Sequence, residues 1–131
     1  MYTWIEHTSE LELAIEAPTE AAVFTDALAA FVELVRDDGS LYGERREIEL
    51  RSDDRAALLA EWLEELVYLA DAQRFVPEHL TDLRLDTGGL HATVRGHRGE
   101  PSALVKAVTR HRLSFEADRE GGWHARVVLD V

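Results

Sequence analysis

The sequence contains no cysteine, and this absence removes several classes of site. A chain without thiols cannot form a disulfide, a thiolate metal centre or a cysteine nucleophile. A chain of 131 residues with 46% apolar content buries enough surface to fold without such crosslinks. No stretch rich in proline, glycine or serine is long enough to act as a linker. We therefore predict one domain spanning residues 1–131.

Long hydrophobic runs are also absent. No segment approaches the length that crosses a membrane, and Met1–His7 carries Glu6 where a signal peptide requires basic and apolar residues. We predict a soluble, cytoplasmic protein without a membrane partner.

Positive charge is scarce, because 14 Lys and Arg face 26 Asp and Glu, giving a net charge of -12. A molecule of this charge repels a phosphate backbone, so direct nucleic-acid binding is not expected. Lys106 is the only lysine, and the other 13 basic residues are arginine. Compositional bias explains the arginines. A lysine retained against that bias is a weak hint of function. Arginine replaces lysine well on a solvated surface, but it does not replace lysine where a compact ammonium group is needed.

The spacing of apolar residues predicts two amphipathic helices and about seven strands. Helical spacing extends over Phe24–Val35 and Leu58–Leu69. Strand-like alternation or composition occurs in seven segments: Tyr2–His7, Leu11–Ile15, Arg46–Leu50, Leu83–Leu85 beyond Pro77, Leu90–Val94, Leu113–Ala117 and Trp123–Leu129. We predict an α+β fold in which one mixed or antiparallel sheet carries both helices on one face.

Polar residues mark the expected helix ends. Pro18 and Thr19 precede the first helix, and Asp37–Ser40 should stop it. For the second helix we predict Ser52 as the N-cap, with Asp53 and Asp54 in the first turn.

The last strand runs to Asp130 and Val131, which places a side-chain carboxylate beside the terminal carboxylate. With a third carboxylate from a neighbouring strand, these oxygens would suit Ca²⁺ or Mg²⁺. A solvated acidic terminus is the alternative. The segment His7–Glu10, at the junction of the first two strands, is either a site-lining loop or a polar connector.

The other polar residues point away from familiar catalytic sites. His91 and His97 share the polar side of a strand, so we predict that both are solvated. His111 and His124 match no helical zinc motif, no serine lies in a G-x-S-x-G turn, and no glycine-rich phosphate loop is present.

Four segments, in order, resemble the archease family. His7-Thr8-Ser9-Glu10-Leu11 is similar to its His-Thr-Ala-Asp-Val/Ile motif, and Lys106–His111 is similar to its Lys-Ala-x-Thr-Tyr-His segment. Leu58–Asp71 resembles its second-helix signature, and Trp123–Val131 resembles its C-terminus. The resemblance spans nearly the whole chain.

The resemblance implies a non-catalytic protein activator of the ligase that joins RNA 3′-phosphate and 5′-hydroxyl ends in tRNA splicing and RNA repair. Such an activator promotes guanylylation and multiple turnover of the ligase. Carried over by position, the family's metal ligands fall on Glu10, Asp130 and the carboxylate of Val131, which would bind Ca²⁺ or Mg²⁺/Mn²⁺. The residue important for ligase activation falls on Lys106.

Four positions depart from the family pattern. Glu10 stands in place of Asp, Ser9 in place of Ala, Glu12 in place of Gly and Arg110 in place of Tyr. Two other functions therefore stay open, a protein-binding or chaperone-like modulator of another partner and a metal-dependent hydrolase built on Glu10 and Asp130. No residue stands out as a general base with an orienting partner, which weakens the hydrolase reading.

Overall fold

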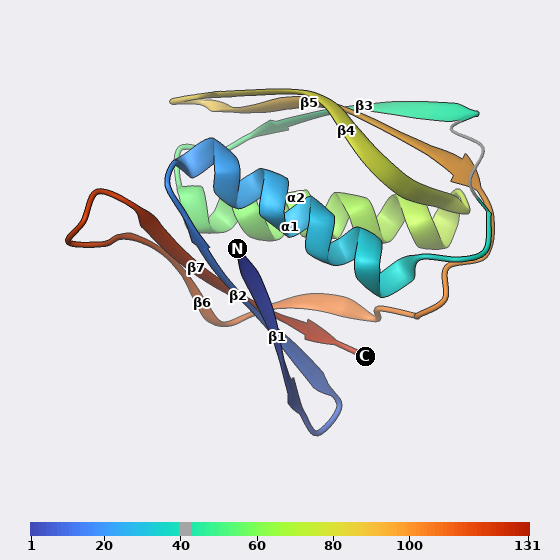
Figure 1. Cartoon of the computed structure of the whole chain (residues 1–131), viewed down its shortest axis with the longest axis horizontal. Helices are drawn as coiled ribbons and strands as arrows, with labels where there is room; N and C mark the ends of the chain where they lie inside the picture. The colour runs from blue at the N-terminus through green and yellow to red at the C-terminus, as the bar shows by residue number, and fades with distance from the viewer. Residues whose placement is uncertain (40–42) are drawn as a thin grey trace.

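Two antiparallel sheets enclose a layer of two helices (Figure 1). The structure, a computed structural model, describes residues 1–39 and 43–131. The four-stranded sheet has the order β1 (Tyr2–His7), β2 (Glu10–Ala17), β7 (Trp123–Asp130) and β6 (Ala107–Ala117). The three-stranded sheet has the order β3 (Glu44–Arg51), β5 (Gly89–Arg98) and β4 (Phe75–Asp86). The helices between them are α1 (Glu20–Val35) and α2 (Arg55–Ala72).

The predicted α+β class, with seven strands and two helices, is confirmed. The strands are divided between two sheets where one was expected, and the helices contact both sheets. Alternation within a strand identifies its buried face but carries no information about which strands pair. Both predicted hairpins are present, since β4 pairs with β5 and β6 pairs with β7.

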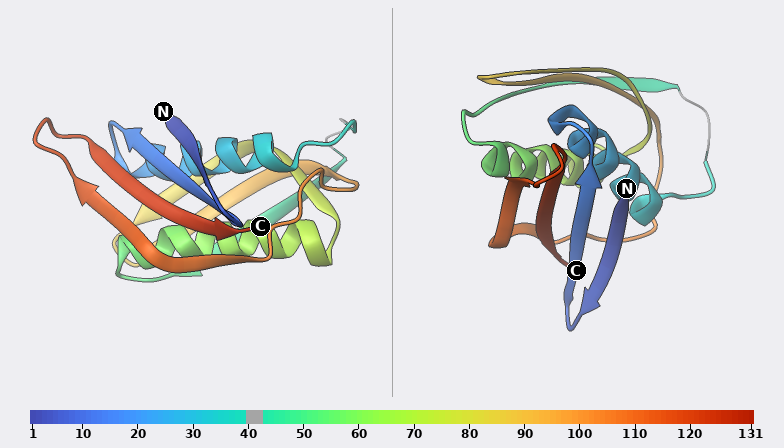
Figure 2. Two further views of the ribbon diagram at one scale, coloured as in Figure 1. Left: turned by 90° about the horizontal axis from the view of Figure 1, so that it is seen from below. Right: turned by 60° about the vertical axis from the view of Figure 1, so that its left-hand side comes forward.

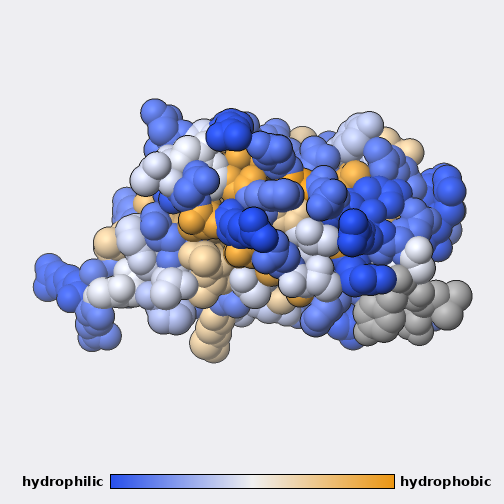
Figure 3. Space-filling model, turned by 90° about the horizontal axis from the view of Figure 1, so that it is seen from above, coloured by the Kyte–Doolittle hydropathy of each residue, from blue (hydrophilic) through white to orange (hydrophobic). Residues whose placement is uncertain are grey.

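The core lies between the sheets and is centred on the helices. The apolar stripe of α2 is broad because the helix is covered on two sides, and its buried residues are Leu58, Leu59, Ala60, Trp62, Leu63, Leu66, Leu69 and Ala70. Trp62 Nε1 donates a buried hydrogen bond of 3.0 Å to the carbonyl of Phe24 and thereby links α2 to α1. The outer face of the three-stranded sheet is mostly hydrophilic (Figure 3).

The helix ends partly follow the prediction. Thr19 caps α1, where its Oγ1 accepts a hydrogen bond from the amide of Ala22 at 3.1 Å. The N-cap of α2 is Asp54 and not Ser52, because the helix begins at Arg55 and the Asp54 carboxylate accepts from the amide of Ala56 at 3.1 Å. Ser52 instead accepts from the Asp54 amide at 3.2 Å and so supports the capping residue.

The boundaries of two other segments differ from expectation. Helix α1 ends at Val35, ahead of the predicted stop at Asp37, and Ser40 lies outside the described residues. Strand β4 begins at Phe75, before Pro77, and a register shift follows the proline. A bulge of this kind is where a strand tolerates a residue without an amide hydrogen. Across the described ranges, no helix is both long enough and apolar enough to span a bilayer.

Candidate functional site at the end of the four-stranded sheet

The sheet brings the four predicted site residues to one place. Glu10 lies directly opposite Asp130 in the pairing of β2 with β7. Directly opposite residues of an antiparallel pair project from the same face, so the two carboxylates are neighbours. The amide of Lys106 donates to the carbonyl of Asp130 at 2.8 Å, and the amide of Val131 donates to the carbonyl of Ser9 at 3.2 Å. We call these residues, Glu10, Lys106, Asp130 and Val131, the strand-end site.

The turn between β1 and β2 holds the chain terminus in position. Ser9 adopts a left-handed conformation with φ 61°, which is uncommon outside glycine. Its carbonyl accepts the Val131 amide, so the last residue is tied to the turn. Figure 2 shows the C-terminus at this end of the sheet. The turn at residues 7–10 is therefore packed against residue 131, at the same end of the sheet as Asp130.

A buried carboxylate lies next to this site. Glu12 is only 3% exposed although it alternates with the core residues of β2. It pairs with Arg126, and its Oε1 lies 3.4 Å from His7 Nε2 and 3.7 Å from Arg112 Nη2. Burial alone would raise the pKa of Glu12, but hydrogen bonds to Arg126 and His7 and the arginine charges outweigh it and lower that pKa. Glu12 is thus held in its charged form.

A bulge in β6 places Arg112 close to both Glu10 and Glu12. The register passes from Thr109 opposite Val128 to Ser114 opposite Arg126, so residues 110–113 have no regular partners. Bulges re-aim side chains, and Arg112 adopts φ 60° within this one. Its Nη2 lies 3.4 Å from Glu10 Oε1, so a predicted metal ligand already has a cationic neighbour.

The charged group around Glu12 was not predicted from the sequence. The alternation of β2 places Glu12 on a polar face, which is typical of a solvated side chain. Its arginine partners come from β6 and β7, about a hundred residues away. The one available signal is the departure at Glu12, where the resemblance to the archease family leads one to expect glycine, a residue without a side chain.

The donor set of the strand-end site fits a hard divalent cation. Carboxylate oxygens are the ligands that Ca²⁺ and Mg²⁺ prefer. Within residues 1–39 and 43–131, no three His, Cys, Asp or Glu side chains are grouped so as to hold a metal ion. Glu10 and Asp130 supply two side-chain carboxylates, so a cation held by them would need further oxygen ligands, from the backbone, from water or from the Val131 carboxylate.

The predicted exposure of His97 is wrong, whereas His91 is exposed as expected. His97 is 6% exposed, with Nε2 2.6 Å from Asp37 Oδ1 and Nδ1 3.3 Å from Glu78 Oε2. Burial would lower the pKa of His97, but the hydrogen bond to Asp37 and the charges of Asp37 and Glu78 outweigh it and raise that pKa. Period-2 alternation fails here because the segment after α1 folds over the end of β5 and covers this side chain.

Comparison with known proteins agrees with this architecture. The chain matches the Archease protein family over residues 2–131. It is 31% identical over 140 residues to protein archease of Methanosarcina acetivorans, covering 99% of this chain and 95% of that protein. It is 32% identical over 139 residues to protein archease of Methanopyrus kandleri, covering 97% of this chain and 96% of that protein.

Two solved structures share the fold. The solution structure of a Methanobacterium thermoautotrophicum protein superposes with a TM-score of 0.78 at 28% identity, covering 99% of this chain and 98% of that one. The crystal structure of an "archease, possible chaperone" from Thermotoga maritima gives a TM-score of 0.72 at 21% identity, covering 100% and 98%.

Two antiparallel sheets around a helix pair define an α+β protein, in which Glu10 and Asp130 lie opposite each other at one strand end. The family match over residues 2–131 identifies the protein more closely: this chain belongs to the archease family.

Proposed function

We propose that this chain is a non-catalytic activator of the RNA-splicing ligase, which promotes guanylylation of that enzyme and its multiple turnover. The observation that carries the proposal is the strand-end site. Residues from three separate segments, which sequence resemblance alone assigns to metal binding and ligase activation, meet at one end of one sheet. A family assignment over residues 2–131 supports reading them together.

The chemistry of the strand-end site suits contact with a phosphate-handling partner. Lys106 is exposed, and its backbone is fixed to Asp130 by the 2.8 Å hydrogen bond. A lysine held in this way presents a compact positive charge to a phosphate or an acidic group. Its backbone position beside Asp130 places the lysine at the same end of the sheet as the carboxylates.

Glu10, Asp130 and the terminal carboxylate of Val131 would hold the divalent cation in this proposal. When bound, such an ion supplies a positive charge and open coordination positions for oxygen ligands. Glu10 carries one methylene more than the aspartate of the family motif, and Arg112 lies within ion-pair distance of it. Lys106, the remaining residue of the strand-end site, is held by its backbone hydrogen bond to Asp130 and does not depend on the ion.

The net charge of the chain fits a protein partner better than RNA. At -12, the molecule repels RNA but is attracted to a surface that itself binds RNA and is therefore basic. The proposal places this encounter in the cytoplasm and assigns the RNA contacts to the ligase.

The test is a guanylylation and multiple-turnover joining assay with the ligase of the same organism. Wild-type protein should stimulate both reactions, and Lys106→Ala and Asp130→Ala should abolish stimulation while remaining folded by circular dichroism. Arg119→Ala, at the exposed turn between β6 and β7, and Asp82→Ala, on β4, are controls of the same charge types and should stimulate normally.

A chaperone-like modulator of another protein is the second candidate, favoured by the "possible chaperone" description of the Thermotoga maritima relative. Absence of any stimulation by the wild-type protein would exclude ligase activation and favour this candidate. Hydrolysis of phosphate esters by pure protein, lost in Asp130→Asn, would instead support a metal-dependent hydrolase.

A further inference from the structure

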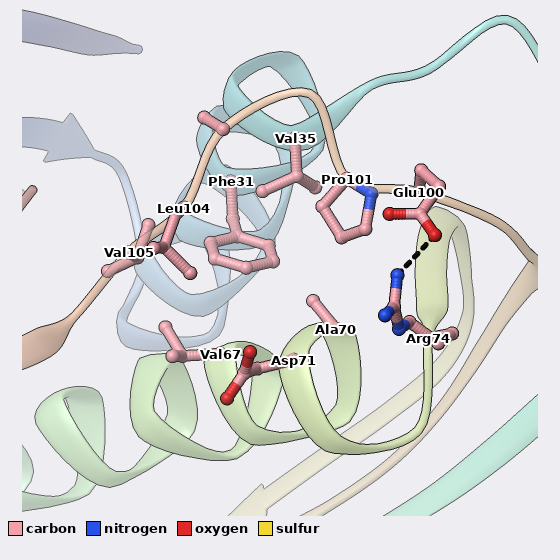
Figure 4. A pocket seen from close by; sticks show the side chains of 11 residues that line it. Phe31, Val35, Val67, Ala70, Asp71, Arg74, Glu100, Pro101, Leu104 and Val105 are labelled. Carbon is pink, nitrogen blue, oxygen red and sulfur yellow. Dashed lines mark hydrogen bonds and ion pairs between the residues drawn. The ribbon is translucent and has the colours of Figure 1, made fainter.

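A small pocket opens between the helices and the segment that leads into β6 (Figure 4). Its cavity has a volume of about 240 Å³. Pockets for drug-sized ligands and cofactors usually measure about 300–1,000 Å³, so this one has the size of a side chain. None of the residues of the strand-end site lines it.

Most of the residues that line the pocket are apolar, but polar atoms make up as much of its exposed surface as apolar atoms do. Phe31 and Val35 of α1 face Val67 and Ala70 of α2, and Val105 closes the side towards β6. Phe31, Val35, Ala70 and Val105 are buried members of the hydrophobic core. Because these residues are packed in the core, their positions are fixed, and an aliphatic chain would lie against a preformed surface.

One carboxylate gives the pocket a net negative charge. Arg74 and Glu100, at one end, form an ion pair with each other and cancel. Asp71, which also lines the pocket, is exposed, and its carboxylate makes no hydrogen bond or ion pair with another residue of the described ranges. Its charge is thus available to a cation that enters from outside.

The surface around the pocket has the composition of a protein-binding site. Leu104 is 65% exposed and lines the pocket, and Tyr68 is 53% exposed, three residues before Asp71 on α2. These are two of the three large hydrophobic side chains that are exposed among the described residues. Exposed leucine and tyrosine beside a pocket are typical of protein interfaces, in which aromatic anchors are enriched.

We propose that this pocket receives a lysine or arginine side chain of a protein partner. The aliphatic stem lies against Phe31, Val67 and Val105, and the cationic group pairs with Asp71. Long basic side chains bury their methylene groups and keep the charged end at the rim, which matches apolar lining residues beside the one carboxylate, Asp71, that has no ion-pair partner among the described residues. Leu104 and Tyr68 contact the backbone around the inserted residue.

The pocket also lies close to the strand-end site along the chain. Lys106 follows Leu104 by two residues, and its amide bonds to Asp130. A partner seated at the strand-end site would therefore reach the pocket with an adjoining segment. The inference rests on the proposed function only for the identity of that partner.

The decisive experiment titrates ¹⁵N-labelled protein with n-pentylammonium, pentan-1-ol and pentanoate and follows amide shifts by NMR. The ammonium should shift the amides of Asp71, Leu104 and Val105 with a Kd on the order of millimolar. The alcohol should bind about fivefold more weakly, and pentanoate should bind more weakly still.

The matched variants are Asp71→Asn and Glu47→Gln. Glu47 is an exposed carboxylate of β3, in the other sheet. Asp71→Asn should weaken ammonium binding about fivefold, and Glu47→Gln should leave it unchanged. Equal binding of ammonium and pentanoate, equal binding by wild type and Asp71→Asn, or no shifts at the pocket would each overturn the proposal.

A second arm measures binding of the RNA-splicing ligase by calorimetry. If wild type fails to bind the ligase while pentylammonium still binds at Asp71, the proposed function falls and the pocket inference stands. If the ligase is activated but the amine does not bind, the pocket inference falls and the proposed function stands.

Discussion

Two buried ionisable side chains, Glu12 and His97, fasten together segments that are far apart in the sequence. Glu12 on β2 is held by arginines of β6 and β7, and His97 on β5 lies between Asp37 and Glu78. A buried charge is tolerated only where opposite charges and hydrogen bonds compensate for its lost hydration. Removing one partner therefore leaves the other charge buried without compensation.

The His97 cluster makes stability depend on pH. The pKa of His97 is raised, so its stabilising contribution is complete below the unfolded value of about 6.5 and is lost as pH rises through the folded value. The pKa of Asp37 is lowered: burial would raise it, but the amide of Gly39 and then His97 outweigh that. The contribution of Asp37 is lost only as pH falls through its folded value in acid.

We predict that His97→Gln destabilises the protein by about 3 kcal/mol at pH 6 and by less at pH 9. Urea unfolding at both pH values measures the difference. His91→Gln, an exposed histidine on the same strand, is the control and should behave as wild type at both. A penalty that stays constant with pH would show that His97 acts by packing alone.

Arg112 should compete with a cation at the strand-end site. Its guanidinium lies 3.4 Å from Glu10 and carries the charge that a divalent ion would supply. We predict that Arg112→Gln tightens Ca²⁺ or Mn²⁺ binding about fivefold, measured by calorimetry. Arg119→Gln, at the exposed turn between β6 and β7, is the matched control, because it removes the same charge without touching Glu10 or Glu12. Weaker binding by Arg112→Gln would mean that the arginine supports the site.

At the scale of elements, the ends of the helices depend on single side chains. Periodicity predicted both helices, because a broad apolar stripe recurs every three to four residues in each. The cap of α2 was placed two residues too early, since Ser52, Asp53 and Asp54 are all good capping residues. Local sequence does not distinguish among them, and the choice depends on where β3 ends.

We predict that Asp54→Ala lowers the free energy of unfolding by about 1 kcal/mol, because the amide of Ala56 loses its acceptor. Ser52→Ala should cost less than half as much, since the Ser52 hydroxyl bonds only to the backbone of the capping residue. Both are measured by urea unfolding monitored by circular dichroism. A larger loss for Ser52→Ala would identify the serine as the energetically important cap.

At the scale of the whole molecule, the excess of acidic side chains governs association. A net charge of -12 accelerates encounter with a basic partner and is screened by salt. If the RNA-splicing ligase is the partner, as proposed above, we predict that its rate of association with this protein falls about tenfold or more between roughly 0.05 and 0.5 M NaCl. Stopped-flow or surface plasmon resonance measures this rate. A rate independent of salt would contradict electrostatic steering.

The predictions that were confirmed are those that depend only on the local sequence of a segment. The seven strands, both helices and both hairpins follow from local spacing and turn residues. The division into two sheets, the burial of His97 and the position of Arg112 depend on contacts between distant segments. Resemblance, and not spacing, selected Glu10 as the neighbour of Asp130, and the register of β2 with β7 places them together. Whether they bind a cation stays a prediction.

The pairing of β2 with β7 also constrains how the chain is made. Residues 10–17 lie beside residues 123–130, as the blue and red strands of Figure 1 show. While the ribosome is still producing the chain, β2 and β6 have no strand between them, and their open edges can pair with other chains. Translation stalled before residue 123 should therefore yield a chaperone substrate or an aggregate in place of a folded domain, although only the last strand is missing.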